Sequence, residues 1–215
     1  DNSSYIVDTT PPTVSSVAIT NVVGVQNSFL NAGDNVSVTV TFSESPISAV
    51  IVDNTSAATL TLVVGDTNRT AKYHSGDSTV VSSGSDNASL VFRYTIQATN
   101  TSGENDDDGI SIVADALNSN IITISDAAGN IATNSDLTHS AVDHNSSYKV
   151  DTIPPAVTTF VMDDIEIKTG DNATVDLVFS EPASFSSDDD ITVAYGTLAA
   201  MTSSDNITWT GTFTP

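Results

Sequence analysis

Acidic residues in turns are the candidate functional groups of this sequence. The 215-residue chain has 27 acidic residues, 23 Asp and 4 Glu, against 5 basic residues. Asp favours turns and caps over helix interiors, and it is the usual oxygen donor in Ca²⁺-binding loops. The excess of Asp over Glu therefore indicates an all-β protein whose loops could bind a hard, oxygen-preferring cation.

Catalytic motifs find little support in the sequence. Its three histidines, His74, His139 and His144, have no zinc-type spacing, and the chain has no Cys. No G-x-S-x-G nucleophile motif and no Gly-rich phosphate loop occurs. We expect no enzyme, and we expect His139 and His144 to be exposed polar residues.

The net charge of −22 excludes further classes of function. Such a chain repels phosphate backbones and anionic lipid surfaces, so neither a nucleic acid nor direct membrane insertion is expected. No run of 18 apolar residues is present to span a bilayer. With 39% hydrophobic residues the chain can still bury a core.

An internal repeat divides the chain. DNSSYIVDTTPP at 1–12 matches DHNSSYKVDTIPP at 143–155, and AGDNVSVTVTFSES at 32–45 matches TGDNATVDLVFSEP at 169–182. We therefore expect a tail strand and linker from a preceding repeat at 1–10 and a complete repeat at 11–150. Residues 151–215 are expected to be the first part of a second repeat, without its last strands.

Within each repeat the hydrophobic period is two, as in strands with one buried face. Turn clusters at 31–35, 75–77 and 127–130 separate these stretches. Val91, Arg93, Thr95 and Gln97 are expected to face outward. The pattern predicts an antiparallel β-sandwich. The rows expected to face inward are Val36, Val38, Val40 and Phe42; Ala173, Val175, Leu177 and Phe179; Leu60, Leu62 and Val64; Leu90, Phe92, Tyr94 and Ile96; and Ile207, Trp209 and Phe213.

The order VDTTPPTV, GDNVSVTVTFSE, NDDDGISI and DAAGN resembles the bacterial Ig-like repeats of giant, type I secreted surface adhesins of the repeat-in-toxin type. The second copy, with DTIPP and TWTGTFTP, is similar to a shorter Ig-like variety from such proteins. The resemblance implies tandem Ig-like domains, stiffened by Ca²⁺, that hold a distal binding domain away from the cell.

Strand topology predicts where the carboxylates meet. Successive strands of a seven-stranded Ig-like sandwich run in alternate directions, so the linker and two loops share one pole. Asp8, Glu44, Asp126 and Asn130 are expected to converge there on one Ca²⁺. At the opposite pole the loop at 104–109 is expected to face the next linker and the following repeat. The candidate ligands at that pole are Asp106, Asp108, Asp143, Asp151 and Glu181.

Several of these features also have interpretations that require no metal. Asp in a turn is commonly a solvated cap, which is one interpretation of Asp188–Asp190. The 106–109 stretch departs from the EF-hand pattern, so an EF-hand is rejected. The Pro pairs at 11–12 and 154–155 would stiffen a linker with or without a metal.

The function favoured is a structural extender of a large extracellular, cell-surface adhesin, with neighbouring Ig-like repeats of the same chain as partners. One alternative is a subunit of a surface filament or surface layer, in which strands are exchanged between copies. A second alternative is a carbohydrate- or ice-binding module that uses the outward row Thr208, Thr210, Thr212 and Thr214.

Overall fold

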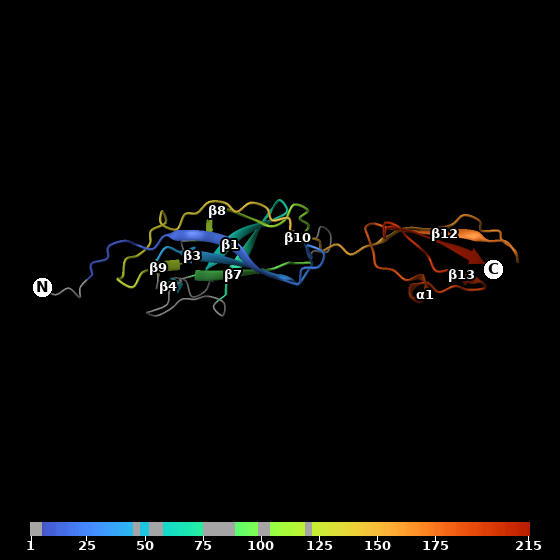
Figure 1. The fold of residues 1–215 in the computed structure, drawn as a ribbon, viewed down its shortest axis with the longest axis horizontal. Coiled ribbons are helices and arrows are strands. Elements are labelled where there is room, and N and C mark those ends of the chain that lie inside the picture. Colours follow the sequence, from blue (N-terminus) through green and yellow to red (C-terminus); the bar gives the residue numbers. More distant parts are fainter. Residues whose placement is uncertain (1–5, 45–47, 52–57, 75–88, 99–103, 119–121) are drawn as a thin grey trace. The chain divides into compact units, whose positions relative to one another are not determined.

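The computed structural model describes residues 6–44, 48–51, 58–74, 89–98, 104–118 and 122–215. The expected turn at 75–77 and the first five residues of the expected tail strand lie outside these ranges. Two compact units are present, residues 1–153 and residues 154–215 (Figure 1). Each is described by itself below.

The first unit is built around a six-stranded antiparallel sheet with strand order β1-β3-β7-β6-β5-β8. A short antiparallel pair, β4–β9, and a short parallel pair, β2–β10, complete it. The strands are β1 Val14–Val23, β2 Phe29–Leu30, β3 Asn35–Phe42, β4 Ser48–Ile51, β5 Thr59–Val64, β6 Thr67–Tyr73, β7 Ser89–Thr95, β8 Ser111–Leu117, β9 Ile122–Ser125 and β10 Lys149–Val150.

The core of the first unit is formed by side chains on one face of each main strand. Val36, Val38 and Val40 of β3 are fully buried, as are Leu60 and Leu62 of β5. These side chains share one cluster with residues of β7, β8 and β9, so the strands enclose a common interior as a sandwich does. The inward rows expected in β3, β5 and β7 are confirmed.

Val91, which was expected to face outward, lies on the face of β7 opposite the core row but is buried there. Val91 is 6% exposed, and Ser37, which also points away from the core rows, is 4% exposed. Both lie on strands with neighbours on either side, since β3 pairs with β1 and β7, and β7 pairs with β3 and β6. In the middle of a sheet, adjacent strands shield short side chains on the outer face as well.

The parallel β2–β10 pair shows where the first unit ends. Lys149 and Val150 lie beside Phe29 and Leu30, and Val150 is fully buried. The backbone N–H of Asp151 donates to the Leu30 carbonyl at 2.9 Å, and that of Thr152 donates to Asn105 Oδ1 at 3.2 Å. Asp151 and Thr152, expected to open the second repeat, are therefore bonded into the first unit.

The second unit has a four-stranded antiparallel sheet, order β11-β12-β14-β13, and one four-residue helix. Its elements are β11 Val157–Met162, β12 Ala173–Phe179, α1 Ser187–Asp190, β13 Thr197–Leu198 and β14 Thr208–Thr214. Val175, Leu177 and Met201 form its buried centre, and Trp209 packs edge-on against Phe185 with ring centroids 5.2 Å apart. The inward rows of β12 and β14 are confirmed.

The two units share a detail of register. In the first, β1 pairs with β3 from Val14 opposite Phe42, with a bulge before Ser16. In the second, β11 pairs with β12 from Val157 opposite Phe179, with a bulge before Thr159. These residues are equivalent in the two sequence copies, so the repeated sequence folds into the same local sheet.

Candidate metal-binding clusters

The first cluster joins the segment before β1 to two loops of the first unit. Asp8 precedes β1, Glu44 follows β3, and Asp126 follows β9 directly. Carboxylate oxygens of all three lie within 4.8 Å of one another. Strand topology predicted that four residues meet at this pole. The structure brings three of them together, and the fourth, Asn130, is hydrogen-bonded to Asp126 and Asp8.

Asn130 is that fourth residue, and it acts as a donor. Its Nδ2 lies 2.7 Å from Asp126 Oδ2 and 3.2 Å from the backbone oxygen of Asp8, and its backbone N–H donates to Asp126 Oδ1 at 2.8 Å. The turn closes because Gly129 adopts a φ of +93°. Asn130 therefore orients Asp126 and ties it to the segment that carries Asp8.

Asp8 occupies the same local turn as its repeat counterpart. Its Oδ1 accepts a 3.0 Å hydrogen bond from the Thr10 N–H, and Asp151 Oδ1 accepts one of 3.0 Å from the Ile153 N–H. Such Asx turns hold one carboxylate oxygen and leave the other available. Both linker copies thus present an Asp side chain in the same way ahead of the Pro pair.

Repulsion among the three carboxylates of the first cluster favours the binding of a cation. The pKa of Glu44 is raised by burial and then by the charges of Asp8 and Asp126. Burial acts to raise the pKa of Asp126 as well, but hydrogen bonds from the side chain and backbone of Asn130 outweigh it and lower that pKa. Three carboxylates held this close repel one another unless a proton or a positive ion lies among them.

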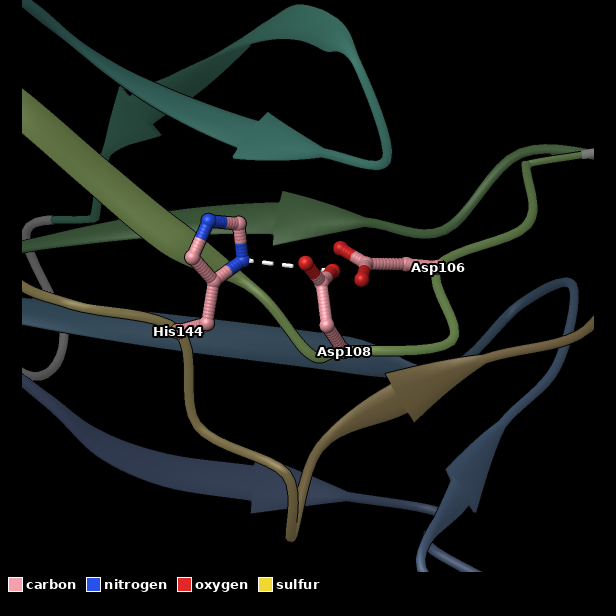
Figure 2. Close-up of side chains that lie close together, drawn as sticks. All are labelled: Asp106, Asp108 and His144. Carbon is pink, nitrogen blue, oxygen red and sulfur yellow. Dashed lines mark ion pairs between the residues drawn. The ribbon is translucent and has the colours of Figure 1, made fainter.

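The second cluster lies where the loop before β8 meets the segment before β10. It contains Asp106, Asp108 and His144, whose ligand atoms lie within 4.8 Å of one another (Figure 2). His144 Nδ1 is 3.3 Å from Asp108 Oδ1 and 2.9 Å from the Gly109 carbonyl oxygen. Asp106 is 2% exposed, and its two oxygens accept hydrogen bonds from Gly65 N at 2.8 Å and Gly109 N at 2.6 Å.

His144 is the member that sequence reasoning missed as a candidate ligand. It is exposed, as expected, with 49% of its side chain accessible. Its distance from Asp108 along the chain shows no ligand spacing, because the contact depends on the pairing of two distant segments. The available signal was its position beside Asp143 in the repeated linker motif.

The remaining predicted ligands are Asp143, Asp151 and Glu181. Asp143 is exposed next to His144, Asp151 is half-buried after β10, and Glu181 follows β12 in the second unit. Within the first unit, neither Asp143 nor Asp151 belongs to either cluster among the described residues. Asp188–Asp190 belong to α1 and are exposed, and Ser186 Oγ lies 3.0 Å from Asp189 Oδ2, so this run is a solvated helical turn.

A buried charge also escaped the sequence analysis. Glu104 is 2% exposed and accepts hydrogen bonds from the Tyr94 hydroxyl and the Gln97 N–H, while Arg69 Nε lies 2.6 Å from its Oε1. The pKa of Tyr94 is raised by burial and by its bond to Glu104. This network fixes the start of the loop that carries Asp106.

The fold defines an all-β protein with Ig-like β-sandwich architecture. Residues 151–215 match the family model of a bacterial Ig-like domain. No curated protein and no solved structure matches the chain. In the part of the chain that the structure describes, no helix has the length and apolar character needed to cross a membrane.

Proposed function

We propose that this chain is an extender segment of a large extracellular surface adhesin, in which Ig-like modules follow one another and Ca²⁺ stiffens their junctions. The observation that carries the proposal is the convergence of Asp8, Glu44 and Asp126. The match of residues 151–215 to a bacterial Ig-like domain supports a surface-exposed structural module without catalytic activity.

The donor set of the first cluster fits Ca²⁺. Three carboxylates supply only oxygen, and Ca²⁺ accepts six to eight oxygens, including waters, in flexible geometry. Asp8 belongs to the linker, whereas Glu44 and Asp126 belong to the body of the module. An ion held by all three would therefore fasten the linker to the module and limit bending at that point.

The decisive experiment compares the chain in about 5 mM Ca²⁺, a level chosen to saturate weak extracellular sites, with the chain in excess EGTA. Thermal unfolding and small-angle scattering are recorded for the unaltered protein, for Glu44→Gln and for Glu166→Gln, which removes an exposed charge elsewhere. We expect Ca²⁺ to raise the melting temperature and reduce flexibility, except in Glu44→Gln. Identical curves with and without Ca²⁺ in the unaltered protein would refute stiffening by Ca²⁺.

One observation favours a second candidate, assembly by strand exchange. Val7 is 86% exposed and Ile6 is 94% exposed, whereas Val150, the repeat counterpart of Val7, is fully buried in β10. A segment with this sequence can therefore pair with a β2-type edge. Polymers that lengthen with protein concentration, and that are lost in Val7→Asp, would favour this candidate over the extender.

The carbohydrate- or ice-binding alternative gains no support from the described residues. The four Thr side chains of β14 face solvent, but Thr210 Oγ1 donates to Asp176 Oδ1 at 2.9 Å and Thr214 Oγ1 donates to Asn172 Oδ1 at 2.8 Å. Trp209 packs against Phe185 in the core of the second unit. Neither feature forms a free ligand-binding row.

A further inference from the structure

We infer that Asp106, Asp108 and His144 bind a transition-metal ion of the Zn²⁺ type, with a preference distinct from that of the all-oxygen cluster at Asp8, Glu44 and Asp126. The inference goes beyond the proposed function, which concerns the first cluster, and it replaces the Ca²⁺ that the sequence predicted at Asp106 and Asp108. It rests on the donor atoms, their spacing and the rigidity of the two segments that carry them.

The donor set is the first argument. Ca²⁺ and Mg²⁺ select oxygen ligands, whereas imidazole nitrogen suits Zn²⁺, Ni²⁺ and Cu²⁺. Two carboxylates and one imidazole converge here, and Figure 2 shows both Asp side chains directed toward the His144 ring. Two carboxylates also balance the charge of a divalent ion.

The spacing is the second argument. A metal–ligand bond of about 2.1 Å puts adjacent donors roughly 3.0 Å apart in an octahedral site and roughly 3.4 Å apart in a tetrahedral one. His144 Nδ1 and Asp108 Oδ1 are 3.3 Å apart. The Gly109 carbonyl oxygen, 2.9 Å from the same nitrogen, is a further donor within reach.

The third argument is that both segments are held before any ion binds. Asp106 and Val150 exchange two backbone hydrogen bonds, Ile110 N donates to the Tyr148 carbonyl at 3.1 Å, and Asn145 N donates to the Ile110 carbonyl at 3.3 Å. At Gly109 the segments approach so closely that a Cβ would lie 1.9 Å from the Asn145 carbonyl oxygen. Binding an ion would therefore cost little ordering of the backbone.

Burial of Asp106 is the fourth argument. Asp106 is 2% exposed, and its ligand oxygen lies within 4.8 Å of that of Asp108. A buried carboxylate beside a second carboxylate is stabilised by a cation in place of a shared proton. To bind the ion through Nδ1, the neutral imidazole must carry its hydrogen on Nε2, so Nδ1 gives up its hydrogen bond to the Gly109 carbonyl.

The test uses the whole chain without a histidine tag. Isothermal titration with ZnCl₂ and, separately, with CaCl₂ is carried out on the unaltered protein, His144→Gln, Asp108→Asn and the control His139→Gln. We expect His144→Gln and Asp108→Asn to weaken Zn²⁺ binding by at least about tenfold, the least that loss of a direct ligand should cost. His139→Gln should leave the Zn²⁺ affinity unchanged.

Two readouts separate this inference from the proposed function. Co²⁺, a spectroscopic substitute for Zn²⁺, should give visible absorption bands in the unaltered protein that His144→Gln removes. Glu44→Gln should reduce the Ca²⁺ response and spare the Zn²⁺ response, and His144→Gln should do the opposite. Equal Zn²⁺ affinity in the unaltered protein and His144→Gln, or no Zn²⁺ binding at all, would overturn the inference whatever Ca²⁺ does.

Discussion

The side-chain amide of Asn130 donates a 2.7 Å hydrogen bond to Asp126 Oδ2, and through this contact the loop after β9 presents its carboxylate to Glu44 and Asp8. The same amide nitrogen lies 3.2 Å from the Asp8 backbone oxygen. One neutral side chain thus connects the linker to the module without a metal, at the point where we propose that Ca²⁺ does so more strongly.

Replacing Asn130 with Ala should loosen this connection. The substitution removes a hydrogen bond to a charged acceptor, and we expect a loss of about 1.5–3 kcal/mol in the free energy of unfolding of the first unit. The Ca²⁺ response should fall as well, because Asp126 loses its orientation. Urea unfolding with and without Ca²⁺ measures both effects. Asn68→Ala, at an exposed position of β6, is the control, and an equal effect there would contradict the role of Asn130.

Without metal, Glu44 and Asp126 should make the free energy of unfolding depend on pH in opposite directions. The raised pKa of Glu44 means that the folded state binds this proton more tightly than the unfolded chain, whose value is near 4.5. Stability in EGTA should therefore rise as the pH falls from neutrality toward 4.5. The lowered pKa of Asp126 acts oppositely, because its contribution is complete above 3.8 and is lost as the pH falls through the folded value.

Urea unfolding at a series of pH values in EGTA tests this dependence. Glu44→Gln should reduce the rise between neutrality and pH 4.5 without abolishing it, because the pKa values of Asp106 and His144 are raised as well. Glu166→Gln, which removes the same charge from the second unit, should retain the full rise. In saturating Ca²⁺ the slope should reverse, since protons compete with the ion for the carboxylates. A rise that persists unchanged in Glu44→Gln would assign it to other groups.

The two valines of the repeated linker motif should respond differently to truncation. Val150→Ala should cost roughly 2 kcal/mol, because Val150 is fully buried and the change leaves a cavity. Val7→Ala should change the free energy of unfolding by less than about 0.5 kcal/mol, because Val7 is 86% exposed. Thermal or urea unfolding of both variants measures the difference. Similar losses would mean that Val7 is also buried in solution.

Gly109→Ala should be more damaging than a change at another glycine with the same backbone conformation. Gly109 has φ +98° and a Cβ there would meet the Asn145 carbonyl, whereas Gly33 has φ +96° and open space around its Cβ position. Gly33→Ala should cost about 1–2 kcal/mol from the left-handed backbone alone. If Gly109→Ala loses more unfolding free energy than Gly33→Ala when both are measured without metal, the two segments approach each other this closely in solution. Equal losses would show that the segments can separate.

Much of the fold and of the first cluster could be predicted from local sequence patterns. Alternation along β3, β5 and β7 identified the core rows, because a strand directs successive side chains to opposite faces whatever its neighbours are. The turn at 127–130 was predicted from its Gly and Asn for similar reasons. The convergence of Asp8, Glu44 and Asp126 also followed from strand direction, since alternation of direction decides which loops share a pole.

Other features depended on contacts between distant segments. Val91 is covered because β7 lies inside the sheet, and the parallel β2–β10 pair draws Asp151 into the first unit. The burial of Glu104 beside Arg69 and the approach of His144 to Asp108 depend equally on which segments become neighbours. The strands, the turns and the acidic composition could be predicted from the chain alone, because they follow from local chemistry. Local chemistry could not predict which carboxylate meets an arginine or an imidazole, since packing and register between segments far apart in the chain set those distances.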